Sequence, residues 1–297
     1  MIYFDSAATT LQKPESVYAA VQRTMRACAS VGRGGHAAAD AAARVVYACR
    51  TEAAELFDAV PEQIVFTMNA THGLNIALRS LVRPGGRVVL SGMEHNAVTR
   101  PLAALGAQIE TAGAPPFAPE RLLEGFARAL RQGAAAAVCT HVSNVYGNVL
   151  PVSAIAALCR ERGVPLIIDA SQSAGTLPVS LSGTGAAFIA MPGHKGLYGP
   201  QGTGLLLCGA AGEPLLLGGT GSNSLDQSMP DFLPDRHEAG THNVCGIGGL
   251  LAGLRFVRER RPEELLAVER ALTALAARGL RQLPGVEVFT GPGQCGV

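Results

Sequence analysis

The sequence carries little charge and no excess of either sign. Only 16% of its 297 residues are charged, and 24 basic residues nearly balance 23 acidic ones, leaving a net charge of +1. Without a basic excess we expect no binding to nucleic acid. No apolar run approaches the roughly 18 residues that span a membrane, and the first residues lack the features of a signal peptide. We therefore expect a soluble cytoplasmic protein with no membrane contact.

Lysine is almost missing. Of the 24 basic residues, 22 are arginine, and the two lysines are Lys13 and Lys195. Arginine does not lose its proton and form an imine, whereas lysine can. A search for a nucleophilic amine is thus confined to two positions.

Closely spaced cysteine pairs are also missing. The seven cysteines are far apart and none belongs to a C-x-x-C pair, which argues against a disulfide framework or a zinc site. Buried thiols in a reducing compartment are the simpler interpretation. His36 and Asp40 lie four residues apart, but no third ligand accompanies them. We expect no metal site.

Apolar segments of strand length alternate with segments whose apolar residues recur at helical spacing. The expected strands are residues 64–67, 87–91, 108–112, 135–142, 165–170, 186–191 and 204–208. The expected helices are residues 71–81, 98–105, 119–131, 152–162, 244–258 and 263–282. This alternation predicts an α/β fold with a mostly parallel sheet and helices on both of its faces.

The ends of the chain and one long connection are less regular. Residues 1–9 are predicted to form a short strand and a turn, and the Gly- and Pro-rich residues 209–241 an ordered extended excursion. Residues 286–289 are predicted as a strand, and residues 293–297 as the start of another.

Polar clusters follow several of the predicted strands, where a parallel sheet places its ligand. They comprise residues 69–72, 94–96, 143–144, 169–172, 193–195 and 238–241. A phosphorylated aromatic aldehyde requires a lysine amine for an imine, a carboxylate for its ring nitrogen and a helix N-terminus for its phosphate. The clusters contain all three kinds of group.

Each of these residues also has an ordinary structural interpretation. Lys195 alone could be a surface lysine, and Asp169 a helix cap or turn residue. Thr71 could be an N-cap, and His95 and His194 hydrogen-bonded core histidines. The interval from Asp169 to Lys195 is more informative, because an acid that ends one strand and a lysine just after the next face the same crevice.

Eight segments together resemble the class V aminotransferase-like branch of fold-type I pyridoxal phosphate (PLP) enzymes, and within it the cysteine desulfurases. Their order and spacing match that family from residue 3 to the end of the chain. The segments are YFDSAATT at 3–10, GRGGH at 32–36, NATHGLN at 69–75, MEHN at 93–96, HVSNVYG at 141–147, DASQSAG at 169–175, GHKGLYGP at 193–200 and EAGTHN at 238–243.

The resemblance implies a role for each matching residue. Lys195 would bind PLP covalently and move the α-proton of the substrate, with His95 on the ring face as the second catalytic group. The implied cofactor-binding residues are Ala70, Thr71, His72, His95, Asn144, Asp169, Ser171, Gln172, His194, Lys195 and Thr241. Of these, Asp169 would pair with the ring nitrogen, and Gln172 and Asn144 would reach the ring oxygen. The substrate side would include Ala8, Thr9 and His36.

The resemblance also implies an assembly and a division into domains. Thr241 would reach the phosphate of a second subunit, which implies a homodimer with its sites at the interface. Residues 1–16 would form an N-terminal strap and residues 17–255 the large PLP-binding domain. Residues 256–297 would begin a small C-terminal domain of α/β type that is incomplete here.

Two departures from the family pattern stand out. Pro192 occupies a position where the family usually has Ser or Thr, and proline offers neither a hydroxyl nor an N–H. One phosphate contact should therefore be missing, with His72 and Ser171 as candidates to compensate. The family also has an arginine for the substrate carboxylate and a sulfur-accepting cysteine that we expect beyond Val297. Cys295 falls too early to be that cysteine.

The resemblance implies conversion of L-cysteine to L-alanine, with the sulfur passed to an acceptor as a persulfide and a sulfur-acceptor protein as a partner. Alternatives on the same scaffold are a selenocysteine lyase or another class V enzyme, including a transaminase of small amino acids. A cofactor-binding but inactive truncated scaffold is an alternative of a different kind. The residues considered so far do not separate these alternatives.

Overall fold

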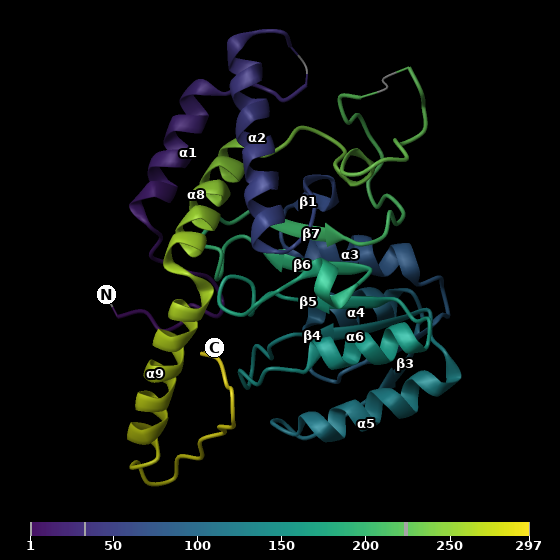
Figure 1. Cartoon of the computed structure of the whole chain (residues 1–297), viewed down its shortest axis with the longest axis vertical. Helices are drawn as coiled ribbons and strands as arrows, with labels where there is room; N and C mark the ends of the chain where they lie inside the picture. Colours follow the sequence, from purple (N-terminus) through teal and green to yellow (C-terminus); the bar gives the residue numbers. More distant parts are fainter. Residues whose placement is uncertain (1, 33, 223–224, 297) are drawn as a thin grey trace.

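A seven-stranded sheet forms the centre of the computed structural model, which describes residues 2–32, 34–222 and 225–296 (Figure 1). The strand order is β1-β7-β6-β5-β4-β2-β3. The strands are β1 (Ile64–Thr67), β2 (Arg87–Leu90), β3 (Gln108–Thr111), β4 (Ala136–Thr140), β5 (Leu166–Asp169), β6 (Phe188–Pro192) and β7 (Gly204–Cys208). All seven coincide with expected strands to within two residues.

The sheet is mostly parallel, as predicted. Strands β3, β2, β4, β5 and β6 pair in parallel, whereas β7 is antiparallel to both of its neighbours, β6 and β1. Since β1 and β6 are both antiparallel to β7, β1 points in the same direction as β6. The carboxyl ends of β1, β2, β4, β5 and β6 therefore lie along one edge of the sheet.

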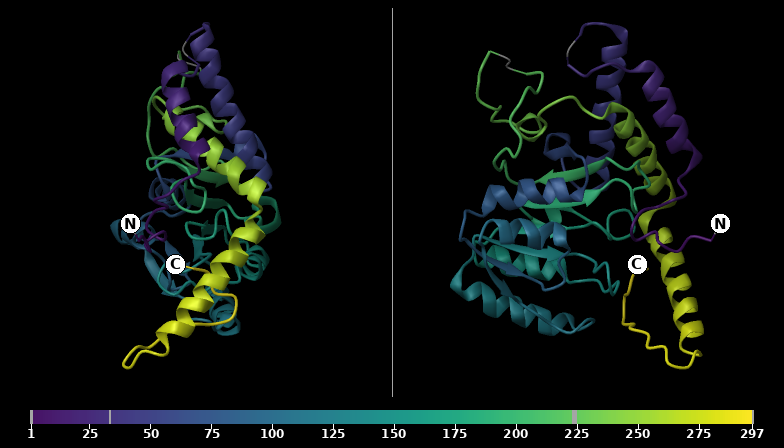
Figure 2. Two further views of the ribbon diagram at one scale, coloured as in Figure 1. Left: turned by 90° about the vertical axis from the view of Figure 1, so that its left-hand side faces the viewer. Right: turned by 180° about the vertical axis from the view of Figure 1, so that it is seen from behind.

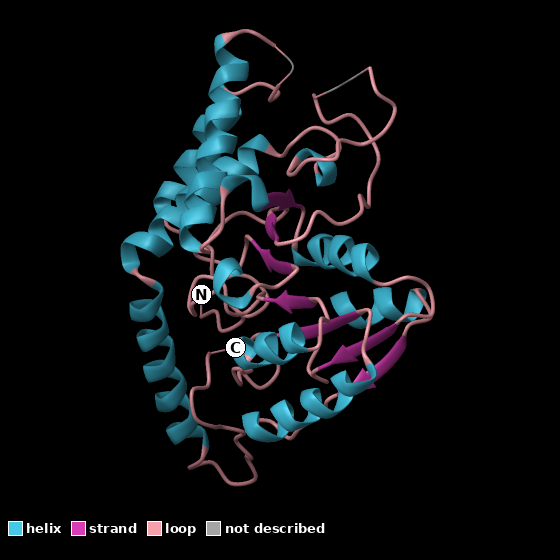
Figure 3. Ribbon diagram, turned by 45° about the vertical axis from the view of Figure 1, so that its right-hand side comes forward, coloured by secondary structure: helices cyan, strands magenta, loops and turns pink. Residues whose placement is uncertain are grey.

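Helices cover both faces of the sheet (Figures 2 and 3). The helices are α1 (Glu15–Ala27), α2 (Ala37–Leu56), α3 (Ala70–Leu81), α4 (Asn96–Ala104), α5 (Pro119–Ala129), α6 (Val152–Glu161), the short α7 (Leu181–Thr184), α8 (Val244–Arg260) and α9 (Pro262–Leu280). Three short 3₁₀ segments are η1 (Pro61–Gln63), η2 (Leu130–Gln132) and η3 (Asp235–His237). Helices α3 and α4 pack on one face, and α2, α5, α6 and α8 on the other.

The alternation of side chains along each strand explains this two-sided core. In β4, Ala136 and Val138 belong to the cluster under α3 and α4, whereas Ala137 and Cys139 belong to the cluster on the opposite face. All five residues of β4 are buried, which is the pattern of a strand covered on both faces. The expected three-layer arrangement is thus confirmed.

Two helices that the sequence patterns did not predict, α1 and α2, pack along α8. The buried apolar side chains of α2 are chiefly alanine, which favours helix but contrasts weakly with its neighbours, so the periodic signal of α2 is faint. Helix α1 does present an apolar face, on which Val17 and Ala20 are buried, and this face was not recognised from the sequence. The expected domain boundaries at residues 16 and 255 stay predictions; α8 continues without a break across residue 255.

The strands predicted in residues 1–9, 286–289 and 293–297 do not form in the described part of the chain. A strand needs a neighbouring strand to pair its backbone, and these segments bond to loops instead. Residues near the N-terminus bond to the loop after β6, and the Cys295 N–H donates to the Gly147 carbonyl at 2.8 Å. The excursion at 209–241 contains η3 but otherwise lacks helix and strand over its described residues.

No helix among the described residues is both long and apolar enough to cross a membrane.

Substitution of Gly253 tests how closely α8 packs against the loop that follows β6. A Cβ atom at this position would lie 2.2 Å from the Leu197 carbonyl oxygen, in the loop that follows β6. Gly253→Ala should therefore lower the free energy of unfolding by about 1–3 kcal/mol, because the helix and the loop must separate. Denaturant unfolding measures the change.

Gly279 in α9 is the matched control, because a Cβ atom there meets no atom within 4 Å. Gly279→Ala should stabilise the chain by about 0.5 kcal/mol through helix propensity alone. Equal effects of the two substitutions would contradict the packing argument.

Candidate active site

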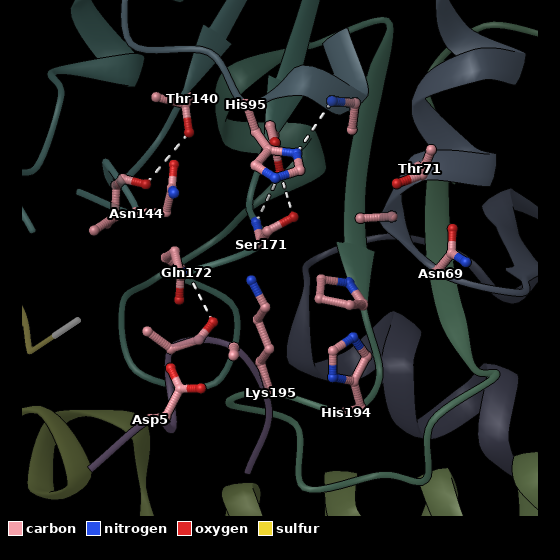
Figure 4. A pocket seen from close by; sticks show the side chains of 17 residues that line it. Asp5, Asn69, Thr71, His95, Thr140, Asn144, Ser171, Gln172, His194 and Lys195 are labelled. Carbon is pink, nitrogen blue, oxygen red and sulfur yellow. Dashed lines mark hydrogen bonds between the residues drawn. The ribbon is translucent and has the colours of Figure 1, made fainter.

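A cavity of about 440 Å³ opens at the edge where the parallel strands end (Figure 4). Thr140, Asp169 and Pro192, the last residues of β4, β5 and β6, all line it. The remaining lining residues come from loops beyond these strands, from the starts of α3 and α4, and from the N-terminal segment. They are Asp5, Ala7, Ala8, Asn69, Ala70, Thr71, His95, Ala97, Val142, Asn144, Ser171, Gln172, His194 and Lys195.

Asp169 lines the cavity and is only 3% exposed. The Ser171 N–H donates to its Oδ1 atom at 3.0 Å, and the Ser171 hydroxyl donates to the same oxygen. Within the described residues Oδ2 makes no hydrogen bond. The carboxylate is thus oriented through one oxygen, while the other remains available to a ligand.

Lys195 enters the cavity from the loop after β6. Its side chain extends toward His95 and Ser171 (Figure 4). Burial lowers the pKa of the Lys195 amine, while the charge of Asp169 acts in the opposite direction. A larger neutral fraction follows than for a surface lysine at the same pH, and the neutral amine is the nucleophilic form.

His95 serves as the N-cap of α4 and lines the cavity at the same time. Its Nδ1 atom accepts a hydrogen bond from the Ala97 N–H at 3.1 Å. Because that bond fixes Nδ1 as an acceptor, a neutral ring carries its proton on Nε2. His95 is thus an exposed helix-capping residue rather than a core histidine, and its expected role on the ring face of the cofactor stays a prediction.

The first turn of α3 forms one end of the cavity, with Asn69, Ala70 and Thr71 in its lining. The Asn69 side chain accepts from the His72 N–H at 2.9 Å and caps the helix. Other N–H groups of a first helical turn have no partner within their helix, which makes this end suited to an anion. Pro192 also lines the cavity, where it supplies no donor.

His194 lies beside this helix start and is held by the N-terminal segment. Its Nδ1 atom is 3.0 Å from the Thr9 hydroxyl, and its carbonyl accepts from the Thr10 N–H at 3.0 Å. Burial lowers the pKa of His194, and the nearby charges of Lys195 and Lys13 lower it further.

Four predicted site residues do not line this cavity. Thr9 contacts His194 instead. His72 and Thr241 line a neighbouring cavity of about 220 Å³ on the other side of the α3 start. His36 caps α2 by accepting from the Ala39 N–H. Their predicted roles toward the cofactor stay predictions, and the position of His72 does not favour its replacing the hydroxyl absent at Pro192. Arg33, within one matching segment, lies outside the described residues.

Several lining residues were not assigned a role from sequence. Asp5 and Asn69 stand inside the matching segments, so their position was a usable signal. Thr140 and Val142 lie within the segment predicted as a strand (135–142). They were missed because only the polar residues that follow each predicted strand were taken as candidate site residues. Cys295 packs against Val142 from behind, is 1% exposed, and has a pKa raised to about 11, chiefly by burial.

The family model for aminotransferase class-V matches residues 2–295. The chain belongs to this family. A probable cysteine desulfurase of Xylella fastidiosa is 32% identical over 313 residues, covering 100% of this chain and 74% of the relative. A cysteine desulfurase of Klebsiella pneumoniae is 32% identical over 317 residues, covering 99% of this chain and 76% of the relative.

Solved structures agree with this class-V assignment. The apo cysteine desulfurase of Thermococcus onnurineus superimposes with a TM-score of 0.88 at 30% identity, covering 99% of this chain and 77% of that one. A cysteine desulfurase of Escherichia coli gives a TM-score of 0.82 at 27% identity, covering 95% and 74%. The fold is therefore that of the fold-type I PLP enzymes, as the sequence segments indicated.

The neighbouring segment 238–243 is anchored by a buried ion pair. Arg50 of α2 donates to both carboxylate oxygens of Glu238, with an Nη1–Oε1 distance of 2.8 Å, and also to the Ile64 carbonyl. The Phe66 N–H and His242 Nε2 each lie 2.6 Å from a Glu238 oxygen. Burial raises the pKa of Glu238, but the hydrogen bonds and charges of His242 and Arg50 outweigh it and hold the pKa below its usual value.

Glu238→Gln should destabilise the chain by about 3–5 kcal/mol, because it leaves the buried Arg50 guanidinium without its counter-charge. Since the pKa of Glu238 is depressed in the folded state, its contribution is present at neutral pH and is lost as the pH falls through that folded pKa. The difference in unfolding free energy between the two proteins should therefore shrink in acid.

Glu55→Gln is the control, because Glu55 pairs with Arg258 where both side chains are more than half exposed. It should change stability by less than about 1 kcal/mol. Chemical denaturation across a pH series measures both variants, and a small, pH-independent effect of Glu238→Gln would contradict the assignment.

Proposed function

We propose that this chain binds PLP in the cavity and converts L-cysteine to L-alanine, passing the sulfur to an acceptor thiol as a persulfide. The observation that carries the proposal is the meeting of Asp169 and Lys195 in one cavity whose far end is the start of α3. Membership of the class-V family and likeness to proteins named cysteine desulfurase support it.

The groups that line the cavity fit PLP. Oδ2 of Asp169, which has no partner among the described residues, suits a protonated ring nitrogen. Lys195 would hold the aldehyde carbon, and the flat His95 ring would cover the cofactor ring. Ala70, Thr71 and His194 would hold the phosphate.

Gln172 and Asn144 would reach the ring oxygen from the opposite side. The Gln172 side-chain amide already donates one N–H to the Ala7 carbonyl at 3.1 Å. Its second N–H remains available, and Ser171, predicted to contact the cofactor, would act by orienting Asp169.

When bound, PLP supplies an electron sink that stabilises negative charge on the α-carbon. The chain's own residues then have three tasks. Lys195, with its lowered pKa, takes the α-proton of the substrate and returns a proton to the product. Asp169 keeps a proton on the ring nitrogen by supplying the opposite charge, and His95 holds the ring in place.

The net reaction breaks the carbon–sulfur bond of cysteine and forms a sulfur–sulfur bond on the acceptor, with alanine as the other product. We do not assign the accepting thiol to Cys295. Its raised pKa keeps it protonated near neutral pH, and its side chain is buried behind Val142, so it is a weak and inaccessible nucleophile.

We further propose a homodimer, in which Thr241 reaches the phosphate of the second subunit. Thr241 is exposed and sits on the segment anchored by Glu238, away from the cavity of its own chain. The same proposal divides the chain into a strap (1–16), a large domain (17–255) and the start of a small domain (256–297). It also includes an acceptor protein for the sulfur and a cytoplasmic location.

Borohydride treatment of the PLP-loaded chain tests the cofactor site. The absorbance band of the bound cofactor should collapse, and mass spectrometry should find the cofactor fixed to the peptide that contains Lys195. Lys195→Ala should lose both signals. Lys13→Ala is the matched control, since it removes the only other lysine and should leave the label on Lys195. A label on Lys13, or a fully active Lys195→Ala, would refute the assignment.

Asp169→Asn tests the chemistry apart from binding. The variant should still bind PLP but lose about 10²–10³-fold in turnover, because the charge that holds the ring proton is gone. Alanine and sulfide released from cysteine measure the rate. Turnover of selenocysteine alone would favour the lyase alternative, and a bound cofactor with no turnover of either would favour the scaffold.

A further inference from the structure

The N-terminal segment bonds to the loop that carries Lys195, and one of its residues contacts a side chain there. The Thr9 hydroxyl lies 3.0 Å from Nδ1 of His194 and 3.3 Å from the His194 carbonyl oxygen. The Thr10 N–H donates to the same carbonyl at 3.0 Å, and the Thr10 hydroxyl donates to the Lys195 carbonyl at 2.9 Å. Thr10 thus holds the backbone of the loop, whereas Thr9 contacts the His194 ring.

The position of Thr9 is itself fixed through its backbone. Its N–H donates to the Asp5 carbonyl at 3.3 Å, and its carbonyl accepts from the Tyr3 hydroxyl at 2.8 Å. Neither bond uses the Thr9 side chain. Removal of the hydroxyl alone should therefore leave this turn, and the docking of the segment by Thr10, in place.

His194 lines the part of the cavity that suits an anion. It lies on the same side of Lys195 as Thr71, in the first turn of α3 (Figure 4). Pro192 lines the cavity as well and offers no N–H. A donor on the His194 ring therefore adds to the N–H groups of the helix start. Because Nδ1 contacts Thr9, the nitrogen that can serve a ligand is Nε2.

A neutral imidazole donates from one nitrogen and accepts at the other. Burial and the charges of Lys195 and Lys13 lower the pKa of His194, so its neutral form predominates at neutral pH. When Thr9 donates to Nδ1, the ring proton lies on Nε2, and the His194 carbonyl keeps its bond from the Thr10 N–H. When the proton lies on Nδ1, Thr9 accepts it instead. The hydroxyl therefore holds the ring in either form, and an anion beside Nε2 favours the first.

We propose that Thr9 is a positioning residue for the phosphate, because its hydroxyl holds the His194 ring through Nδ1 so that Nε2–H donates to the phosphate of the cofactor. The inference rests on the proposed function, in which His194 contacts that phosphate. It places the effect of Thr9 at the phosphate, whereas the resemblance implied a role on the substrate side.

PLP and pyridoxal are matched probes, because they differ only in the phosphate group. Their dissociation constants are measured by calorimetry and from the absorbance of the bound cofactor. Thr9→Val keeps the shape of the side chain but removes the hydroxyl. It should bind PLP about tenfold more weakly and pyridoxal as the wild type does. Thr9→Ser keeps the hydroxyl and should bind both ligands as the wild type does.

The position of the ring proton is a second readout. In the PLP-loaded wild type, labelled with ¹⁵N-histidine, NMR spectra should show a proton on Nε2 of His194. The variant His194→Gln identifies the signals of this residue by their loss. An Nε2 atom without a proton in the loaded wild type would overturn the proposal.

Thr51→Val is the control for the substitution itself. The Thr51 hydroxyl donates to the Tyr47 carbonyl within α2, and Thr51 does not line the cavity. Both dissociation constants should stay unchanged in this variant. A loss of PLP affinity equal to that of Thr9→Val would show that the effect does not come from the contact with His194.

An equal loss of affinity for PLP and pyridoxal in Thr9→Val gives the residue a structural role and overturns the proposal. An unchanged PLP constant also contradicts it but leaves the proposed function intact, and weaker binding of L-alanine in that case would return Thr9 to the substrate side. A wild type that binds neither PLP nor pyridoxal contradicts the proposed function as well.

Discussion

The site depends on the parallel register of β4, β5 and β6. Thr140 pairs with Asp169, and Asp169 with Ala190, so β4 and β5 end on a common line and β6 runs two residues beyond it. The loop that follows each strand must therefore turn at this edge of the sheet. Lys195 reaches the cavity because β6 ends two residues after Ala190 and the following loop folds back over the edge. A strand reversed in this part of the sheet would send Asp169 or Lys195 to the opposite edge.

Much of this arrangement follows from sequence, for identifiable reasons. The strands are short, buried on both faces and bounded by polar residues, so each was recognisable alone. The acid and the lysine directly follow such strands, and parallel pairing then decides that they meet. Contacts that depend on the direction of a side chain were harder to predict from sequence. Consecutive residues of a helix point about 100° apart, so Thr71 faces the cavity while His72 faces the neighbouring one.

The strands that were predicted but do not form have one physical origin in common: no neighbouring strand is available to pair with their backbone. Residues 286–289 are rich in the β-branched and aromatic side chains that favour a strand, yet no neighbouring strand pairs with them in the described chain. The helices α1 and α2 are the converse case. The alanine-rich face of α2 gives a weak pattern, yet both helices pack closely along α8, and α2 contributes to the core. The local sequence pattern therefore predicts a helix or strand reliably only where the elements that pack against it can also be recognised in the sequence.

The N-terminal segment shows how far the site is from being a local structure. Thr9 and Thr10 bond to His194 and to the Lys195 carbonyl, which lie about 185 residues later in the chain. Nothing in the spacing of either segment requires this contact; it forms only when the sheet edge and the loop after β6 are already in place. Since the same turn carries Asp5 and Ala8 into the cavity, docking of the segment completes the wall on the Gln172 side. The sheet edge and the loop after β6 thus supply Asp169 and Lys195, whereas a segment far away in the sequence supplies Asp5 and Ala8 to the same cavity.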